Sequence, residues 1–458
     1  MSHTWTPGWP SGHDFPVEAA APPVGGGTRT RRYPAWFLLA LLAVTFVGVG
    51  VRIAMVVFVD EPSQPGFLVD YDPIFYSRQA NLVADGEGFI APYLLDANDN
   101  GPHRPSAGHP PLLVVVLAAA TKLGARSFEA HRVVTALIGA AVVPLVALIG
   151  AEVAGWRAGI IGGALAAVYP NLWLYDGLLM PEALAGLLVA LALWLSIRYL
   201  KSDGMWWLVG LGATVGLGAL ARGELLFLVL VLVLPVCLLK REKPVGQRLL
   251  LAGVATLVAA LVIAPWAIYN VSRFEKPVLI STAQDTTLGG ANCDLTYHGA
   301  RIGAWAGECF QDILDRGLEE SVAASEVRSR AAHYVRDHLS RVPLVALARV
   351  GRTWDVFEPG DNVTLGELQR RPRAWSWIAL AMYAALVALA VGGAYVLRRE
   401  PSLLVLLSMP VLVTLTGALF WGNPRFRRPA EIVLVVLAGV AIDALLARRA
   451  RPAEAVPA

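Results

Sequence analysis

Charged residues are scarce in this 458-residue chain, since Asp, Glu, Lys and Arg make up 16% of it while 56% is hydrophobic. A soluble domain is about 25% charged and about 45–50% apolar. This imbalance excludes a soluble enzyme with a single membrane anchor, a disordered chain and a nucleic-acid-binding protein. The sequence also lacks the period-two alternation of outer-membrane barrels. A helical protein that crosses a membrane several times remains.

Cysteine is also rare, with three residues in the chain. Cys237 lies inside an apolar run and is expected to serve as a packing residue. Cys293 and Cys309 share one polar loop, and they are expected to pair only if that loop is extracytoplasmic. The sequence has no His/Cys spacing of a structural zinc site and no phosphate-binding loop of the Walker type. Nucleotide hydrolysis is therefore not indicated.

Long apolar runs dominate what is present. Two polar stretches, 60–108 and 270–372, separate them, and a loop as long as the second is usually functional. The runs cover roughly 35–59, 109–124, 129–150, 157–175, 180–200, 206–221, 223–239, 248–269, 375–397, 401–421 and 430–447. These runs predict an all-α polytopic membrane protein with about ten to eleven transmembrane helices.

The pattern divides the chain into five parts. They are a disordered cytoplasmic tail (1–32), a transmembrane core (33–269) that holds a first outer loop (60–108), an extracytoplasmic loop with amphipathic helices (270–372), C-terminal transmembrane helices (373–447) and a cytoplasmic tail (448–458). Within the long loop, 321–357 alternates apolar residues with arginines. That pattern suits a basic helix pair on a lipid surface, and equally a solvated pair packed on its own loop.

Loop charge predicts the orientation of the chain. The first polar stretch holds two basic and eight acidic residues and is placed outside. The second polar stretch is placed outside as well, because basic clusters mark the inner ends of the flanking spans. Those inner residues are Arg29, Arg31, Arg32, Lys240, Arg241, Lys243, Arg248, Arg398, Arg399, Arg448, Arg449 and Arg451.

Seven apolar runs between two outer loops cannot all span the membrane. The shortest, 109–124, opens with two prolines and is interpreted as a re-entrant or interfacial helix, which leaves ten spans. In the alternative, the two runs that flank Arg222 form one broken helix. The first choice puts Glu182, Arg222 and Arg425 on the outer face together with Asp72. Ionisable residues at membrane depth are costly and mark functional sites.

Two acids are candidates for catalysis. Asp72 lies near the start of a short predicted helix, 74–84, where the helix dipole keeps a carboxylate ionised and suited to act as a general base. The same position also suits a simple N-cap. Glu182 opens a span after Pro181 and could orient an acceptor, or share Mg²⁺ or Mn²⁺ with Asp72, although Glu in a first helical turn is also ordinary.

Arginines supply a second candidate feature. Residues 421–429 hold Arg425, Arg427 and Arg428 in a short outer loop, against the positive-inside trend. Such a cluster calls for an anion, and a phosphate at the membrane surface fits it, unless this loop is cytoplasmic. Arg222 either lines the same cleft or forms a surface turn with Glu224.

These residues resemble the GT-C superfamily of membrane glycosyltransferases, in the branch of protein O-mannosyltransferases and lipid A aminoarabinose transferases. The family's D-E-x-x-Y motif is matched by Asp72 and Tyr76, with Pro73 at the second acidic position. Asp72 inherits the catalytic role, and Asp70 is the fallback. The family's K/H-P-P-L element is matched by the run that begins at His109, after glycines 86 and 88.

Further motifs follow in the family's order. The acid of its second outer loop falls on Glu182, its Pro-Trp-x-x-x-Asn element on residues 265–270, and its R-Y-R-x-P element on residues 425–429, with Phe for Tyr. Residues 291–309 look like the outer loop of bacterial members. The resemblance covers about 35–447.

The resemblance implies a reaction. A polyprenyl-phosphate sugar is the donor, and a hydroxyl or amine of a lipid, glycan or protein acceptor attacks with inversion after Asp72 takes its proton. Tyr76 and His109 contribute to substrate binding, and Arg425 and Arg427, together with Arg222, hold the leaving phosphate. The bilayer is a partner and nucleic acid is not. No metal site is assigned, and a divalent cation is the one cofactor that the acids allow.

The implied location is the cytoplasmic membrane, with the active site facing outside. The rival hypothesis is a transporter or flippase of a lipid-linked or anionic solute. It predicts ionisable residues at mid-membrane and paired repeats, and the sequence shows neither. A non-catalytic structural subunit is a third hypothesis, which the concentration of acids and arginines on one face opposes.

Overall fold

The computed structural model describes residues 33–59, 71–96, 100–202 and 204–449. The predicted tail 1–32, the fallback acid Asp70 and the end of the C-terminal tail lie outside these residues. The described part is built from helices and holds no β-strand, apart from an isolated antiparallel bridge between Ile90 and Pro105. The predicted all-α class is confirmed.

The helix bounds follow the apolar runs closely. In and beside the bundle they are α1 (Ala35–Phe58), α3 (Leu112–Lys122), α4 (Phe128–Ala140), α5 (Val142–Ala154), α6 (Trp156–Val168), α7 (Pro170–Trp173), α8 (Glu182–Ser202), α9 (Met205–Ala221), η2 (Gly223–Phe227), η3 (Val229–Val233), α10 (Leu234–Leu238), α11 (Val245–Val271), α18 (Arg373–Val396), α19 (Pro401–Leu419), η6 (Pro424–Arg427) and α20 (Arg428–Arg449).

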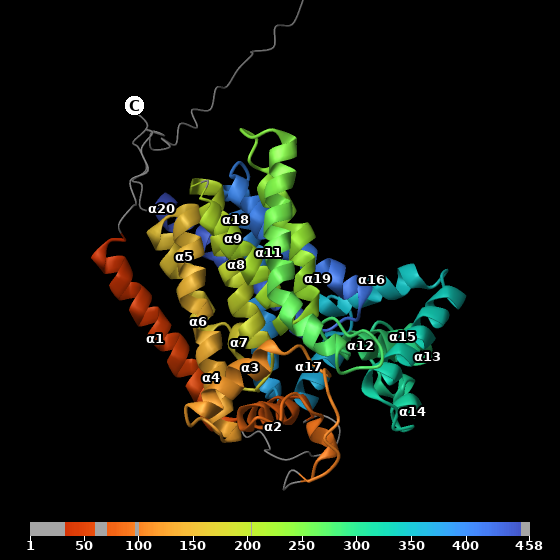
Figure 1. Cartoon of the computed structure of the whole chain (residues 1–458). Helices are drawn as coiled ribbons and strands as arrows, with labels where there is room; N and C mark the ends of the chain where they lie inside the picture. Colours follow the sequence, from red (N-terminus) through yellow and green to blue (C-terminus); the bar gives the residue numbers. More distant parts are fainter. Residues whose placement is uncertain (1–32, 60–70, 97–99, 203, 450–458) are drawn as a thin grey trace, which may run out of the picture. The chain divides into compact units, whose positions relative to one another are not determined.

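The polar stretches form shorter helices, as predicted. They are α2 (Tyr71–Asp85), η1 (Pro92–Leu94), α12 (Ala283–Ala291), α13 (Asp294–Tyr297), η4 (Gly299–Arg301), η5 (Gly307–Cys309), α14 (Gln311–Leu314), α15 (Glu320–Asp337), α16 (Val342–Thr353) and α17 (Pro359–Leu368). In Figure 1, α2, α12 and α17 lie toward the lower end of the bundle, where α8 begins.

Among the described residues, seven helices are long and apolar enough to cross a membrane. They are α1, the bent pair α4 and α5, α8, α11, α18, α19 and the segment from η6 through α20. Four shorter apolar helices complete the set: α3, α6, α9 and the segment Gly223–Leu238. Together they account for all eleven predicted runs.

Contacts at the two ends of α8 set the direction of its neighbours. Arg222, just before the segment Gly223–Leu238, contacts Glu182 at the start of α8. Lys240, just after that segment, donates to the carbonyl of Leu200 at the end of α8 over 2.9 Å. The segment therefore runs with α8, and α9 runs against it. The two runs that flank Arg222 thus form an antiparallel pair, which a single broken helix that crosses the bundle once would not form.

The helix α3 does not pass through the bundle. Its eleven residues extend about 16 Å at about 1.5 Å per residue, against about 30 Å of hydrocarbon. Its last turn is bonded to the start of α4 and to α2, because Thr121 contacts His131 of α4 and Asn81 of α2 over 2.9 Å each. Among the described residues, seven helices are thus long enough to cross a membrane, and α6, α9 and the segment Gly223–Leu238 are apolar helices below that length.

Glycines allow α9 and α11 to approach at backbone distance. A Cβ atom added to Gly216 would lie 2.7 Å from the carbonyl oxygen of Ala259 and 2.8 Å from Val262. One turn earlier, Gly212 faces Ala255 in the same way. Small residues at such spacing are the usual means of close helix packing in membranes. The contact fixes α9, which ends at the residue before Arg222.

Candidate active site

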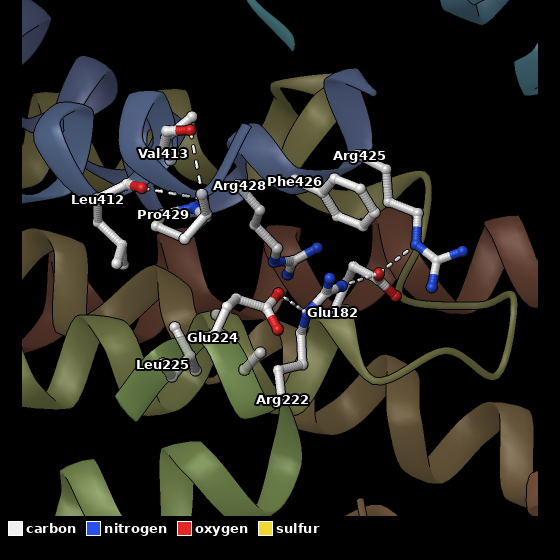
Figure 2. Close-up of a pocket in the computed structure, with 13 residues that line it drawn as sticks. Glu182, Arg222, Glu224, Leu225, Leu412, Val413, Arg425, Phe426, Arg428 and Pro429 are labelled. Atoms are coloured by element: carbon white, nitrogen blue, oxygen red, sulfur yellow. Dashed lines mark hydrogen bonds and ion pairs between the residues drawn. The ribbon is translucent and has the colours of Figure 1, made fainter. Parts of the chain in front are cut away.

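Four of the predicted residues meet at the end of the bundle where α8 begins. They come from distant parts of the chain: Asp72 from α2, Glu182 from α8, Arg222 from the junction of α9 and η2, and Arg425 from η6. Three of them line a pocket between α8, η2, α19 and the start of α20 (Figure 2). Asp72 lies beside it, 4.0 Å from Arg425. The predicted convergence is therefore present.

Glu182 is the centre of this group. Pro181 precedes it, so the carboxylate sits in the first turn of α8, where the helix dipole favours negative charge. The side chain is 1% exposed, and its Oε1 atom accepts hydrogen bonds from Nη1 of Arg222 and Nε of Arg425. Its Oε2 atom has no hydrogen-bond partner among the described residues.

Arg222 is held by carboxylates at the edge of its guanidinium group and by an aromatic ring. It follows the last residue of α9 in an extended conformation, and its Nε atom donates to Glu224 over 2.5 Å. The guanidinium carbon also lies 4.8 Å from the ring centre of Phe426. Charge pairing and ring contact together fix the guanidinium plane at the pocket wall.

Arg425 is positioned by a turn rather than by a long helix. The side chain of Asn423 accepts a hydrogen bond from the Arg425 amide over 2.8 Å. The amide of Gly422 donates to the carbonyl of Gly303 over 2.9 Å, which ties the turn to the long polar loop. Arg425 thus reaches toward Glu182 from a turn that is held by its own Asn423 and by the long polar loop (Figure 2).

Asp72 lies next to Arg425 and is the most exposed of the four residues. Its Oδ2 atom is 4.0 Å from Nη2 of Arg425, and its Oδ1 atom is 3.4 Å from Nε2 of His109. Burial raises the pKa of Asp72, but the charge and hydrogen bond of His109, and the charges of Arg425 and Arg222, outweigh it and lower this pKa to about 2. With a side chain 35% exposed, the carboxylate is ionised and accessible at neutral pH.

Tyr76 and His109 form the aromatic wall beside Asp72. Their ring centres are 4.8 Å apart, and Phe75 contacts the same imidazole at 4.7 Å. Tyr76 is fully buried, one helical turn after Asp72. Burial, together with the charges of Asp72 and Glu182, raises the pKa of Tyr76, so its phenol stays protonated.

The loop that presents His109 is fastened from outside the bundle. Arg273, just beyond the end of α11, donates to the carbonyls of Phe89 over 2.6 Å and Ser106 over 2.9 Å. Glu320, at the start of α15, accepts from the amide of Ala107 over 2.9 Å. The turn before this loop needs Gly86 and Gly88, whose φ angles are 94° and 79°. The matched glycines therefore have a structural reason.

Arg427 lies in a different network from the other predicted residues. It is buried, and it donates to Glu431 over 2.6 Å and to Asp355 over 2.9 Å. Its guanidinium carbon is 3.7 Å from the ring centre of Tyr383. These contacts point its side chain away from the Glu182 group. In the described structure Arg427 fixes α20 to α18 and to the segment after α16.

Sequence reasoning missed a group of buried charges beneath the pocket. Asp176 is fully buried and lies 2.6 Å from Nε of Arg52 and 2.7 Å from Nη2 of Arg428. The signal was present, because Arg52 is a single charge inside the first apolar run. Arg428 also lines the pocket, although the motif assigned it no role.

A divalent cation does not fit between Asp72 and Glu182. Arg425 occupies the space between the two carboxylates, and two guanidinium groups already use the Oε1 atom of Glu182. No group of three or more His, Cys, Asp or Glu side chains that could hold a metal ion occurs within the described ranges. The cation that joins these acids is an arginine.

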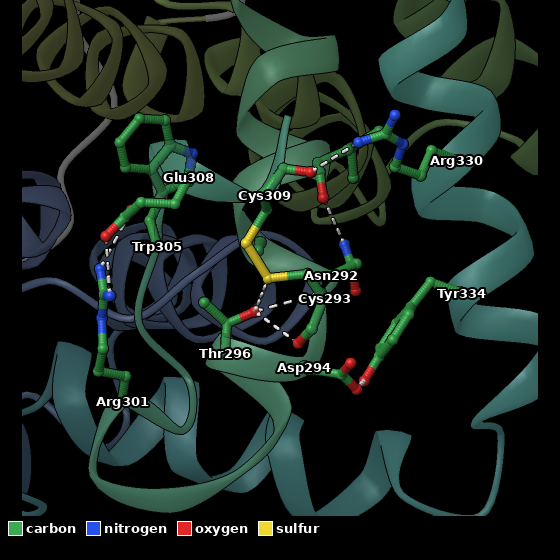
Figure 3. Close-up of a disulfide and its surroundings, with 12 residues drawn as sticks. Asn292, Cys293, Asp294, Thr296, Arg301, Trp305, Glu308, Cys309, Arg330 and Tyr334 are labelled. Atoms are coloured by element: carbon green, nitrogen blue, oxygen red, sulfur yellow. Dashed lines mark hydrogen bonds and ion pairs between the residues drawn. A yellow bond between two sulfur atoms is a disulfide. The ribbon is translucent and has the colours of Figure 1, made fainter. Parts of the chain in front are cut away.

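A disulfide joins Cys293 and Cys309 and closes the loop that contains Trp305 (Figure 3). Figure 3 also shows Tyr334 of α15 bonded to Asp294, over 2.7 Å, and Arg330 at the carbonyl of Cys309. The loop reaches the candidate site through Gly303, which accepts the Gly422 amide. The sequence had left this pairing open.

Comparison with known proteins finds one matching family model and several solved structures with a similar fold. Residues 108–269 match the family model of dolichyl-phosphate-mannose-protein mannosyltransferase. The oligosaccharyltransferase AglB of Archaeoglobus fulgidus, in complex with an inhibitory peptide and a dolichol-phosphate, aligns with a TM-score of 0.53 at 18% identity, over 90% of this chain and 51% of its own. An apo structure of the Archaeoglobus fulgidus oligosaccharyltransferase gives a TM-score of 0.53 at 17% identity over the same shares. The chain has the GT-C fold.

The chain spans about half the length of the archaeal oligosaccharyltransferase it matches. ArnT of Cupriavidus metallidurans, bound to undecaprenyl phosphate, aligns with a TM-score of 0.41 at 13% identity, over 89% of this chain and 77% of its own. No curated protein sequence matches the chain. The fold and the candidate spans define an integral membrane protein.

Proposed function

We propose that this GT-C protein is an inverting glycosyltransferase that moves a sugar from a polyprenyl-phosphate donor to a hydroxyl or amine acceptor. The observation that carries the proposal is the position of Asp72. It is an ionised, accessible carboxylate 4.0 Å from an arginine of the pocket. A base and an anion-binding group lie side by side, as displacement of a phosphate from a sugar requires. The acceptor is a lipid, a glycan or a protein.

The residues divide the reaction between them. Asp72 accepts the proton of the acceptor while the acceptor oxygen or nitrogen forms a bond to the anomeric carbon. The bond from that carbon to the phosphate oxygen breaks, and the electron pair leaves with the phosphate. Arg222 and Arg425 stabilise the charge that develops there. Attack opposite to the leaving group inverts the anomeric centre.

Tyr76 and His109 contribute in a second way. His109 contacts the Oδ1 atom of Asp72 and lowers its pKa, which keeps the base ionised. Tyr76, as a protonated phenol, packs against the imidazole and holds its plane. We assign both residues to the wall of the substrate site. Asp70 lies outside the described residues and keeps its place as the fallback acid in the proposal.

We place the active site on the outer face of the cytoplasmic membrane. Basic residues gather at the opposite end of the bundle, where Lys240 and Arg241 follow α10 and Arg398 and Arg399 follow α18. Cytoplasmic ends of spans carry such residues. The disulfide Cys293–Cys309, in the loop next to the site, supports the same orientation, because disulfides persist in oxidising compartments.

The test is transfer by an Asp72→Asn variant in proteoliposomes that contain a panel of polyprenyl-phosphate pentoses and hexoses together with lipid, glycan and peptide acceptors. We expect the wild-type protein to release polyprenyl phosphate from one of these donors and the variant to lose at least about 100-fold in rate, within the range for a general base. Asp85→Asn is the matched control, since Asp85 lies at the other end of α2 and pairs with Arg126. Full activity of Asp72→Asn would overturn the assignment.

A further inference from the structure

Arg428 belongs to a small buried group of charges, with Arg52 and Asp176, that holds two positive charges and one negative charge. It is the first residue of α20 and is 3% exposed. Its Nη2 atom lies 2.7 Å from Oδ1 of Asp176. The other oxygen of Asp176 accepts from Nε of Arg52 over 2.6 Å. Two guanidinium groups therefore share one carboxylate, and one positive charge in this buried group has no counter-charge within it.

The donors of Arg428 are also unused. Its Nε and Nη1 atoms have no hydrogen-bond partner within the described part of the chain. Buried guanidinium groups are ordinarily hydrogen-bonded, so a buried one with free donors indicates a missing partner. The space is provided by Gly186, where an added Cβ atom would lie 3.1 Å from Cδ of Arg428.

The lining of the pocket changes from apolar at one end to charged at the other, and this order indicates the kind of ligand that fits. One end is apolar and is lined by Leu225 of η2 and by Leu412 and Val413 of α19. The other end holds Glu182 and Arg425, which leads to Asp72. Figure 2 shows the Arg428 side chain extending between these two ends. A ligand that fits this order has an apolar chain, then an anion, then a group that approaches Asp72.

The free acceptor in the pocket fits the same ligand. The Oε2 atom of Glu182 lacks a hydrogen-bond partner among the described residues, as do the two donors of Arg428. A phosphate oxygen would accept from Arg428, and a sugar hydroxyl would donate to Glu182. An apolar solute or a metal cation would leave the Arg428 donors unsatisfied.

We propose that Arg428 is a binding residue for the phosphate of the lipid-linked donor, acting with Arg222 and Arg425 from the apolar side of the pocket. This inference rests on the proposed function. It adds a third guanidinium to the leaving-group site and assigns a ligand-binding role to a residue one position from Arg427, whose side chain is fully engaged elsewhere. Because Arg428 contacts the phosphate only, its role is separable from that of Asp72.

The test compares the binding of two lipids, undecaprenyl phosphate and undecaprenol, to the full chain in detergent micelles. Intrinsic tryptophan fluorescence or thermal stabilisation gives the affinity. The wild-type protein is expected to prefer the phosphate by at least about tenfold, and Arg428→Gln to lose that preference while it binds undecaprenol normally. Arg157→Gln is the control, since Arg157 is an exposed residue of α6 that pairs with Asp443.

A second variant separates phosphate binding from a structural role of Arg428. Asp176→Asn removes the same ion pair but leaves the guanidinium, so it is expected to keep the preference for the phosphate even where it lowers the melting temperature. An Arg428→Gln protein that keeps the preference overturns this inference. If Arg428→Gln weakens the binding of a sugar-bearing donor but not of undecaprenyl phosphate, the inference is overturned as well. A wild-type protein that binds both lipids equally overturns the proposed function together with it.

Discussion

The Nε atom of Arg425 donates to Oε1 of Glu182, although 243 positions separate the two residues in the chain. The contact joins the turn before α20 to the first turn of α8. Glu182 holds Arg222 through the same oxygen. One carboxylate thus sets the spacing of two guanidinium groups, which are the groups proposed to bind the phosphate of the donor.

Loss of the Glu182 charge should therefore damage both folding and activity. In Glu182→Gln, two partly buried arginines lose the shared counter-charge of the buried Glu182. Breaking a buried ion pair costs about 3–5 kcal/mol. We expect a clear fall in melting temperature and at least a tenfold fall in kcat/KM. Thermal unfolding and a transfer assay measure the two effects. Glu242→Gln, at the far end of the bundle, is the control; an unchanged melting temperature in Glu182→Gln would contradict the role.

The pH dependence of the reaction should respond to His109. Its charge and hydrogen bond are the largest causes that lower the pKa of Asp72 to about 2. In His109→Phe the ring contacts remain but these causes are lost, so the pKa of Asp72 rises and the base becomes protonated at a higher pH. We expect the acid limb of the rate profile to move to higher pH than in the wild-type protein. Coincident limbs would remove His109 from this role, and His103→Phe serves as the control.

The pH dependence of folding stability should reflect Glu320, whose pKa is raised, whereas that of Asp72 is lowered. Burial raises the pKa of this carboxylate, although hydrogen bonds from Ser106, Ala107 and Thr282 oppose the shift. The folded state then binds a proton more tightly than the unfolded state, so stability falls as pH rises from the unfolded value of about 4.3 toward the raised value. Glu320→Gln keeps an acceptor oxygen and should abolish this fall.

Melting temperatures of Glu320→Gln between pH 4 and 8 provide the measurement. The matched control is Glu326→Gln, because Glu326 lies on the same helix and forms an exposed pair with Arg316. That variant should follow the wild-type curve. If the wild-type and Glu320→Gln curves are parallel over this range, the charge of Glu320 has no part in the stability of the loop that presents His109.

The disulfide should contribute to the stability of the outer loop. Its cysteines are separated by 16 positions, and a loop of about 15 residues is worth about 3 kcal/mol in the chain-entropy model. Replacing Cys293 and Cys309 by serine should lower the melting temperature and loosen the turn that Gly303 supports. Reductant should reproduce the fall in the wild-type protein and have no further effect on the double variant. A reductant effect in that variant would point to another cause.

The sequence predicted the helices well because hydropathy determines which segments enter a membrane. All eleven apolar runs have a helical counterpart, and α3 is short where the two prolines suggested an interfacial segment. The meeting of Asp72, Glu182, Arg222 and Arg425 followed from counting passes, since parity places all four at one end.

Side-chain pairing could not be read in the same way. Nothing local separates Arg427 from Arg428, yet Arg427 pairs with Glu431 and Asp355 and Arg428 reaches the pocket. The difference arises from the rotation of α20, which depends on long-range packing. Asp176 was missed for the same reason, because its partners Arg52 and Arg428 lie in other segments.

The close approach of α9 and α11 has a consequence for interpreting mutants. Gly216 lies between the backbones of α9 and α11, and a methyl group there would push α9 away from Ala259. Arg222 follows the last residue of α9 and would be displaced with it. A substitution at Gly216 should therefore mimic an active-site defect. A mutational survey that ranks positions by lost activity would then count this glycine among the catalytic residues, although its only task is to be small.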